Sequence, residues 1–197
     1  PWFVAPIISA WLFWFLAGQH PTNEHNMQDF NVLTLEEELS SEELELVVAA
    51  FSELYHRLTF KHHRRLKLKV VCGVDRAEWV MTLARNAKVG SSLELVPNND
   101  FVRNDWSAQD ASILFLPTHK RAGKITREAL SQGVPVVSFQ NESIAEYVDQ
   151  SCGMLVRSRN RSQDIDAFSR ILSMLYFDPE VRKLLKKGAL VKYREIS

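Results

Sequence analysis

The sequence predicts an α/β domain of the doubly wound kind, with a mostly parallel sheet of about six strands and helices on both faces. Short apolar runs alternate with stretches whose apolar residues recur at helical spacing, and this pattern is typical of parallel strands joined by crossover helices. No hairpin turn joins neighbouring apolar runs. The chain has 197 residues, of which 46% are hydrophobic and 24% charged, so it can bury one substantial core.

The chain begins with the uncharged stretch PWFVAPIISAWLFWFLAG, which holds three of the five tryptophans. Pro6 limits its uninterrupted apolar run to 7–17, shorter than the roughly 20 residues that a membrane-spanning helix needs. A signal peptide would begin with basic residues, which this stretch lacks. We therefore predict a linker over 1–6 and a buried strand over 7–17, with a peripheral membrane contact as the alternative.

The following residues, 19–31, are polar and contain Pro21, which predicts a loop. The segment 39–58 then begins with Ser40 and Glu43, three residues apart, which is the pattern of a capping box. Its apolar residues recur every three or four positions, so we expect a helix with one buried face.

Later strands are predicted by short apolar runs bounded by glycine, proline or polar residues, and later helices by helical periodicity with capping residues. Pro179 follows Asp178, a favoured arrangement for the first turn of a helix. In chain order the predicted strands cover 7–17, 66–73, 92–96, 112–118, 134–139 and 153–156, and the longer predicted helices cover 39–58, 75–90, 123–133, 141–150, 162–176 and 178–197. We expect a single domain over 1–197.

Composition excludes several classes of function. Lysine plus arginine equals aspartate plus glutamate, at 24 each, which argues against a nucleic-acid-binding protein. Cys72 and Cys152 form neither a disulfide framework nor a metal-binding spacing, so we expect a reducing, cytoplasmic setting and no metal site. The adjacent histidines His62 and His63 also lack zinc-ligand spacing and suit a basic helix end.

A candidate phosphate site follows the predicted strand 112–118. Ligands of parallel sheets bind beyond the carboxyl ends of the strands, where the free amides of helix N-termini attract anions. The next helix begins at Gly123, which would let a diphosphate approach the amides of Gly123, Lys124 and Ile125.

Charged residues surround this helix start. Lys120 and Arg121 would add charge-assisted contacts to a diphosphate, and Glu128, in the second turn, would accept hydrogen bonds from a ribose diol. Taken by themselves, these residues leave a second interpretation open, in which the basic loop and Glu128 are simply solvated.

Several stretches resemble a known family. The segment EALSQGVPVVSF, from Glu128 to Phe139, is similar to a motif Glu-Ala-x-x-x-Gly-x-Pro-Val-Val, and ESIAEYV (142–148), SCGMLV (151–156) and the closing DPEVRKLLKKGALVKYRE resemble the segments that follow it. From about residue 66 onward the chain resembles the C-terminal, donor-binding domain of GT-B-fold glycosyltransferases of the retaining kind called glycosyl transferases group 1.

That resemblance implies a Rossmann-like domain that binds a nucleotide diphosphate-sugar, with no separate cofactor and with an N-terminal acceptor-binding GT-B domain as its partner. Glu128 then matches the ribose-binding glutamate of the family, and the loop at Gly123 matches its diphosphate-binding loop. The resemblance assigns no catalytic residue in this chain.

The sequence departs from the family at several charged positions. Lys120 stands where the family has a glutamate that contacts the donor sugar. With the first strand at 7–17, Gly18 and Gln19 take the place of the family's Gly-Arg, and Glu24 or His25 that of a lysine. Two alternatives therefore remain: a non-catalytic GT-B-like module for assembly or regulation, and a nucleotide-sugar epimerase.

Overall fold

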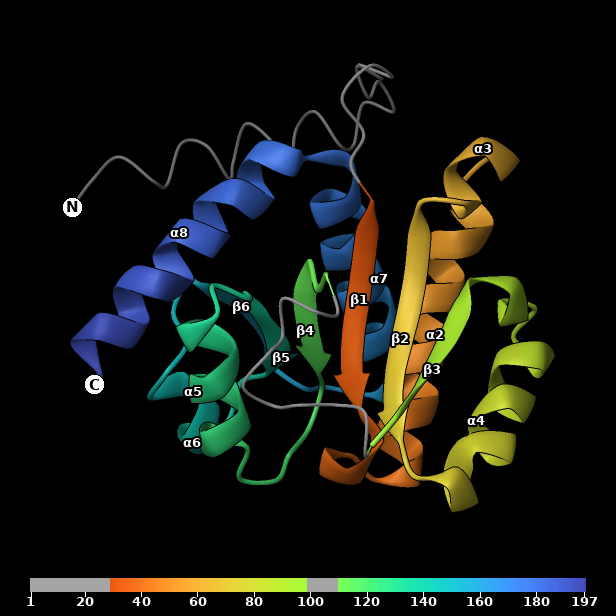
Figure 1. Cartoon of the computed structure of the whole chain (residues 1–197), viewed down its shortest axis with the longest axis horizontal. Coiled ribbons are helices and arrows are strands. Elements are labelled where there is room, and N and C mark those ends of the chain that lie inside the picture. The colour runs from red at the N-terminus through yellow and green to blue at the C-terminus, as the bar shows by residue number, and fades with distance from the viewer. Residues whose placement is uncertain (1–28, 99–109) are drawn as a thin grey trace.

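The computed structural model describes residues 29–98 and 110–197, which form a six-stranded sheet (Figure 1). The strand order is β3-β2-β1-β4-β5-β6, and every neighbouring pair is parallel. The predicted doubly wound, mostly parallel sheet is thereby confirmed.

The strands are β1 (Phe30–Leu35), β2 (Leu66–Cys72), β3 (Leu93–Pro97), β4 (Ile113–Leu116), β5 (Val136–Phe139) and β6 (Gly153–Val156). The α-helices are α2 (Ser41–Arg57), α3 (Phe60–His63), α4 (Val74–Asn86), α5 (Gly123–Ser131), α6 (Glu142–Ala145), α7 (Arg161–Phe177) and α8 (Pro179–Glu195). Two single-turn 3-10 helices, η2 (Glu36–Glu38) and η3 (Gly90–Ser92), follow β1 and precede β3.

The first described strand corrects the sequence analysis. The sequence predicts a loop at Phe30 and Asn31, whereas both belong to β1. The predicted strand at 7–17 and the linker at 1–6 lie outside the described residues. β1 was missed because polar Asn31 and Thr34 interrupt a run of only six residues. It is almost wholly buried because it pairs with β2 and β4 in the middle of the sheet.

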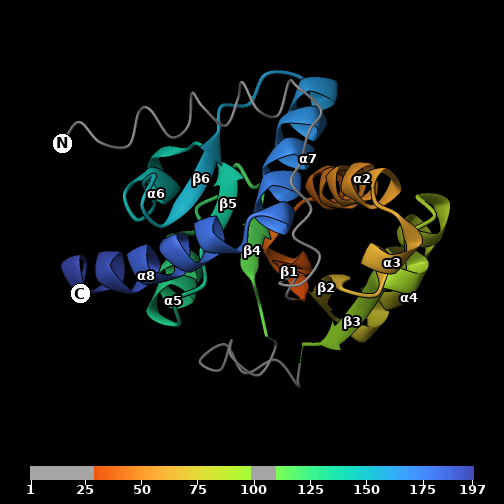
Figure 2. The ribbon, with the colours of Figure 1, turned by 90° about the horizontal axis from the view of Figure 1, so that it is seen from above.

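Helices cover both faces of the sheet. In Figure 2, α2, α4 and α7 lie on one face, and α5, α6 and α8 lie on the other. Helix α2 packs against α7, and α5 packs against α8. This arrangement follows from the order of the strands, because the chain crosses in one direction from β1 to β3 and in the other from β4 to β6.

The predicted capping box at the start of α2 is present. The Ser40 side chain accepts a hydrogen bond from the Glu43 amide at 3.2 Å, and the Glu43 carboxylate accepts one from the Ser40 amide at 2.7 Å. The buried side chains of α2 recur at helical spacing, as expected from its amphipathic sequence.

Helix α4 is shorter than predicted. It ends at Asn86 rather than near Gly90, because Lys88 adopts a φ of 59°, which a helix cannot continue. Helix α6 is likewise a short piece, Glu142–Ala145, within the predicted 141–150.

Helix α8 is fixed to the rest of the domain by close contacts. Arg182 is buried and donates hydrogen bonds to the carbonyls of Leu175 and Tyr176, the last turn of α7. Gly188 lies against the backbone carbonyl of Ser151, where a Cβ atom would stand 1.9 Å from the oxygen. Gly188 and the buried Arg182, together with apolar residues, therefore determine which face of α8 packs against the domain.

Candidate functional site

The direction of the chain reverses between β1 and β4. These two strands are neighbours, but the chain leaves β1 towards β2 and leaves β4 towards β5. In open parallel sheets the carboxyl ends of two such strands flank the crevice that binds ligands. Here those ends are followed by η2 on one side, and on the other by residues 117–122 and the first turn of α5.

The segment 117–122, which we call the β4 loop, is held in place by Glu43. The amide of His119 donates a hydrogen bond to one Glu43 oxygen at 2.8 Å, and the Thr118 hydroxyl lies 3.5 Å from the other. Asn141, at the start of α6, donates from its side chain to the Thr118 carbonyl at 3.0 Å. The sequence indicated Glu43 only as a helix cap, and its second contact depends on the sheet pairing β4 with β1, the strand that precedes α2.

The basic side chains of the β4 loop face solvent. His119 stacks on Phe139, with ring centroids 4.5 Å apart, while Lys120, Arg121 and Lys124 are exposed. Ile125 differs from them, because its side chain is 1% exposed and belongs to the core. Only the amide of Ile125 is therefore available for the predicted phosphate contact.

Gly123 has a packing role that the sequence did not predict. A Cβ atom at this position would stand 2.7 Å from the Tyr147 ring and 3.4 Å from the Ser143 hydroxyl. The absence of a side chain thus lets α5 begin close to the segment after α6. The N-cap residue, Ala122, makes no side-chain hydrogen bond to the helix. The approach of a phosphate to these amides stays a prediction.

Glu128 lies in the second turn of α5 and is half-buried. Its Oε2 atom is buried, and no group of residues 29–98 or 110–197 donates a hydrogen bond to it. A buried carboxylate oxygen without a donor costs on the order of 1–3 kcal/mol. Such an atom is the kind of acceptor that a ligand hydroxyl satisfies.

The other side of the crevice is acidic. Glu36, Glu37 and Glu38 follow β1 directly. Arg76 donates to the Glu36 carboxylate at 2.8 Å, and Asn98 donates to Glu37 at 3.3 Å.

The positions at which the sequence predicts the family's basic pair are not among the described residues. The strand that precedes α2 is β1, so Glu36 and Glu37 come directly after it. Gly18 and Gln19 lie outside the described residues, as do positions 24 and 25, so their roles stay predictions. Several residues after β1, the first turn of α2 also carries acidic Glu42 and Glu43. The loop after β1 and the first turn of α2, as described, therefore carry acidic side chains.

A second basic group was missed by the sequence analysis. Arg157, Arg159 and Arg161 follow β6 and are exposed. Arg161 pairs with Glu45 of α2 at 2.9 Å. The backbone of this loop is fixed because the Arg159 amide donates to Asp164 at 2.9 Å. The sequence RSRNR directly after an apolar strand is a pattern that indicates a basic loop at the carboxyl edge of the sheet.

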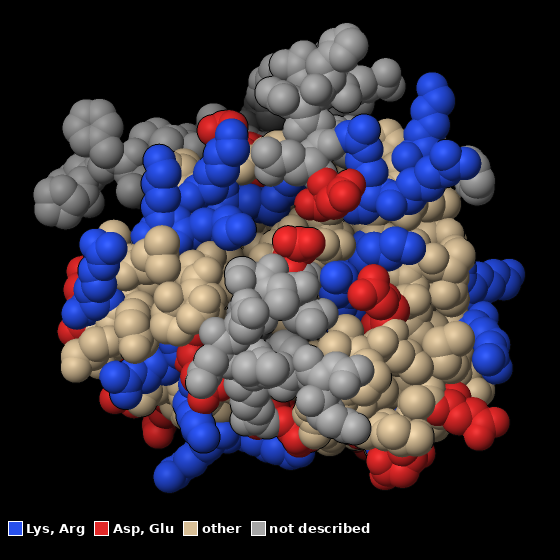
Figure 3. All heavy atoms as spheres, in the orientation of Figure 1, with Lys and Arg blue, Asp and Glu red and all other residues tan. Residues whose placement is uncertain are grey.

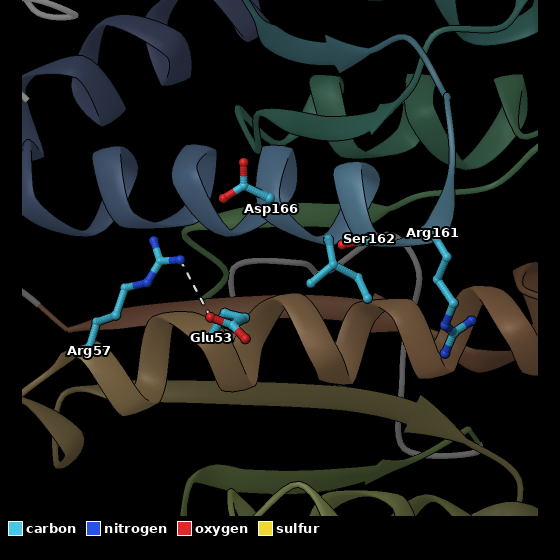
Figure 4. A pocket seen from close by; sticks show the side chains of 6 residues that line it. Glu53, Arg57, Arg161, Ser162 and Asp166 are labelled. Atoms are coloured by element: carbon cyan, nitrogen blue, oxygen red, sulfur yellow. Dashed lines mark hydrogen bonds and ion pairs between the residues drawn. The ribbon is translucent and has the colours of Figure 1, made fainter. Parts of the chain in front are cut away.

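A groove of about 470 Å³ lies elsewhere, on the helical face between α2 and α7 (Figure 4). Two of its charged residues, Glu53 and Arg57, pair with each other along α2 at 3.4 Å. Asp166 pairs with Arg170 at 2.9 Å. Because these charges already satisfy one another, the groove is a weaker candidate than the edge between β1 and β4.

The described residues limit other chemistry. Cys72 and Cys152 are free and buried, and burial raises the pKa of both thiols. Within 29–98 and 110–197, no group of three or more histidine, cysteine or acidic side chains is placed to hold a metal ion. No helix in these ranges is both long and apolar enough to cross a bilayer.

Comparison with known proteins gives a likeness in structure alone. No protein-family model and no curated protein sequence matches the chain. The pneumococcal O-GlcNAc transferase GtfA, solved with UDP and GlcNAc, matches with a TM-score of 0.70 and 14% identity over 86% of this chain and 34% of that one. Sucrose-phosphate synthase from Thermosynechococcus elongatus matches with a TM-score of 0.66 and 18% identity over 86% and 42%.

A third match has nearly the size of this chain. The C-terminal domain of a glycosyl transferase group 1 family protein, LpcC from Francisella tularensis, matches with a TM-score of 0.60 and 13% identity over 88% of each chain. The fold is that of a GT-B glycosyltransferase domain. It accounts for about a third to two fifths of the length of the first two enzymes.

Proposed function

We propose that this chain is the donor-binding half of a retaining GT-B glycosyltransferase, which binds a nucleotide diphosphate-sugar and needs no separate cofactor. An N-terminal GT-B domain would hold the acceptor and close the cleft. The observation that carries this proposal is the Glu128 Oε2 atom of α5, which is buried without a hydrogen-bond donor among the described residues. The fold supports it, because the neighbours in structure are glycosyltransferases.

The diphosphate would lie against the N-terminus of α5. Helix N-termini attract anions, and the first turn of α5 has no side chain capping its amides. Lys120, Arg121 and Lys124 are exposed beside this turn. In sugar transfer the leaving nucleoside diphosphate gains negative charge, so fixed cations and amides there would stabilise the transition state.

The ribose would lie deeper along α5. Its two neighbouring hydroxyls are hydrogen-bond donors, and Glu128 has a carboxylate oxygen that lacks one. Binding would therefore remove the cost of an unsatisfied acceptor, which gives Glu128 a larger effect on affinity than a solvent-exposed carboxylate has.

The acidic loop after β1 restricts where the diphosphate can bind. Glu36 and Glu37 would repel it, although Arg76 partly neutralises Glu36. We therefore place the phosphates on the β4 side of the crevice, with the sugar pointing towards the proposed N-terminal domain. Because the chain spans only part of its neighbours in structure, we assign it no catalytic residue.

The test is calorimetric titration of the folded chain with UDP, GDP and ADP and with their sugar conjugates. UDP comes first, since the GtfA structure holds it. We expect binding in the micromolar to low-millimolar range by one nucleotide, weakened at least about tenfold by Glu128→Gln because the amide cannot accept from both hydroxyls as the carboxylate does. Glu142→Gln, on an exposed carboxylate at the start of α6, is the matched control and is expected to bind as the unmodified chain does.

The outcomes separate the proposal from its alternatives. Equal affinity in the Glu128→Gln and unmodified chains would overturn the role of Glu128. If a chain that is folded by circular dichroism binds no nucleotide, the result would instead favour a non-catalytic module. Interconversion of two free nucleotide-sugars without an acceptor would indicate an epimerase.

A further inference from the structure

Helix α8 exposes apolar side chains. Among the described residues, the large apolar side chains left in solvent are Val74 and, on α8, Leu184, Leu190 and Val191. Leu184 is 66% exposed and Val191 is 53% exposed. They stand seven residues apart, so they lie on one stripe of the helix, two turns from each other.

These side chains cannot turn into the core. The inner face of α8 is already occupied by Arg182, Leu185 and Ala189, all buried. Gly188 on the same face touches the Ser151 carbonyl, so the helix cannot rotate without a clash. The exposed leucines and valine are therefore a fixed property of the outer face.

Cations share this outer face. Lys183, Lys186, Lys187 and Arg194 are exposed on α8, and Lys and Arg side chains gather over this helix in Figure 3. The 17 residues of α8 carry six lysines and arginines but only two acidic residues, Glu180 and Glu195, one near each end. The chain as a whole has no net charge, so this helix concentrates positive charge.

The combination of residues distinguishes between possible partners. Lysine is depleted at the core of protein–protein interfaces, whereas the middle of this outer face is Lys187. At a bilayer surface, lysine stems lie along the apolar boundary while their ammonium groups contact anionic headgroups. Apolar residues interspersed with lysine and arginine are thus typical of a helix that lies on a membrane.

The position of α8 suits such a contact. The strands in Figure 1 run downwards to the edge where the candidate site lies, while α8 runs obliquely from the top of the view to its left side. Contact through the outer face of α8 would therefore leave the carboxyl edge of the sheet accessible.

We propose that the outer face of α8 is a docking surface for an anionic lipid bilayer. Leu184 and Val191 insert among the headgroups, and the lysines and Arg194 bind lipid phosphates. The contact is peripheral and reversible, because a few apolar side chains and about four cations give a moderate, salt-dependent affinity. This proposal does not depend on nucleotide binding.

The test is co-sedimentation of the chain with vesicles of phosphatidylcholine alone and of phosphatidylcholine with a third of phosphatidylglycerol. Residues 1–18 are apolar in sequence, and their binding would not depend on lipid charge. The measured quantity is therefore the ratio of partition coefficients between the two kinds of vesicle. We expect a ratio well above one at low salt that falls towards one in about 0.5 M salt.

Matched variants locate the surface. The double variant Lys183→Gln/Lys187→Gln is expected to lower binding to anionic vesicles by about 30-fold, from the usual contribution of a lysine near such a surface. Leu184→Ser/Val191→Ser is expected to lower it several-fold. The control Arg85→Gln/Lys88→Gln removes two exposed cations at the end of α4 and is expected to leave binding unchanged.

Three results would overturn the proposal. The first is equal binding of the unmodified chain to both kinds of vesicle. The second is unchanged binding of the α8 variants, with circular dichroism showing that they are folded. The third is self-association without vesicles that Leu184→Ser/Val191→Ser abolishes, since the face would then be an interface between copies of the chain.

Discussion

The two halves of the sheet present opposite charges at the edge where their strands end. Glu36, Glu37 and Glu38 follow β1, whereas Lys120 and Arg121 follow β4. Both halves are built from the same parallel strands and crossover helices, so the fold determines only that these loops converge. The chemistry of the crevice depends on the loop residues, which the fold does not constrain.

The halves also differ in how their charges are satisfied. On the acidic side, Glu36 pairs with Arg76, and Glu37 accepts a hydrogen bond from Asn98. On the basic side, Lys120 and Arg121 make no ion pair with any residue of 29–98 or 110–197. Two carboxylates of the acidic half are therefore already bound by residues of the domain, while Lys120 and Arg121 keep their charge for a ligand.

The largest expected effect tests how the basic half is held together. Gly188→Ala would place a methyl group against the Ser151 carbonyl, forcing α8 away from the domain. We expect a loss of about 2–3 kcal/mol in the free energy of unfolding, measured with urea, because overpacking exceeds the gain in helix propensity.

The control lies in the acidic half. A Cβ atom at Gly90 would meet nothing nearer than Arg85 Cγ at 3.8 Å, so Gly90→Ala should change stability by less than about 0.5 kcal/mol. Similar losses in both variants would mean that the contact of Gly188 is not specific.

The second prediction concerns Glu43, which connects the two halves. Glu43→Ala removes both the capping box and the acceptor for the His119 amide, and is expected to cost about 2 kcal/mol in urea unfolding. Hydrogen exchange at the His119 amide should also become faster. Glu42→Ala, on an exposed neighbour, should do neither, and equal effects of the two variants would contradict a bridging role.

The third prediction exchanges the charges of the crevice. Lys120→Gln/Arg121→Gln should lower nucleotide affinity about tenfold, since it removes two cations from the proposed phosphate site. Glu37→Gln should raise affinity about twofold, because a carboxylate at the rim repels the phosphates only weakly through water. Calorimetric titration measures both, and a change of the same sign in both variants would contradict the division of the edge by charge.

The smallest expected effect is a dependence of stability on pH that comes from Asp149, in the half of the sheet that contains β4. Burial raises the pKa of Asp149, but hydrogen bonds from Ser151 and Lys192 outweigh it and lower this pKa to about 2. Because the folded pKa lies below the unfolded value, the stabilisation is present above about pH 4 and is lost as pH falls towards 2.

Asp149→Asn should therefore remove this part of the pH dependence of unfolding. The effect should stay below about 1 kcal/mol, since the side chain is half-exposed. Asp166→Asn, which breaks an exposed ion pair on α7, is the control and should leave the slope between pH 4 and 2 unchanged. An equal slope in the Asp149→Asn and unmodified chains would contradict the prediction.

Much of the fold was predictable from the sequence because it depends on local patterns. The strands at β2, β3, β4, β5 and β6 were found from short apolar runs, and the capping box of α2 from Ser40 and Glu43. β1 was missed because its burial comes from its neighbours in the sheet and not from its own composition. That omission moved the expected start of the crevice away from Glu36.

Less of the candidate site was predictable. Glu128 and the basic loop before Gly123 were singled out from the sequence, and the structure adds that Glu128 Oε2 lacks a donor. No sequence pattern indicated that Tyr147 fills the space beside Gly123, because that contact joins residues that are distant in the chain. The glutamates after β1 and the arginines after β6 lie at the same edge of the sheet. The sequence could not show this, because it depends on the order of the strands.

By itself, the sequence determined that strands and helices alternate, where most of them begin and end, and that a basic loop precedes a helix carrying Glu128. These features rest on periodicity and on capping, which act over a few residues. Only the tertiary structure decided that β1 lies beside β4, that Glu43 holds the β4 loop, and that Leu184 and Val191 remain outside the core. Those facts depend on which distant segments pack together, and no local pattern specifies that.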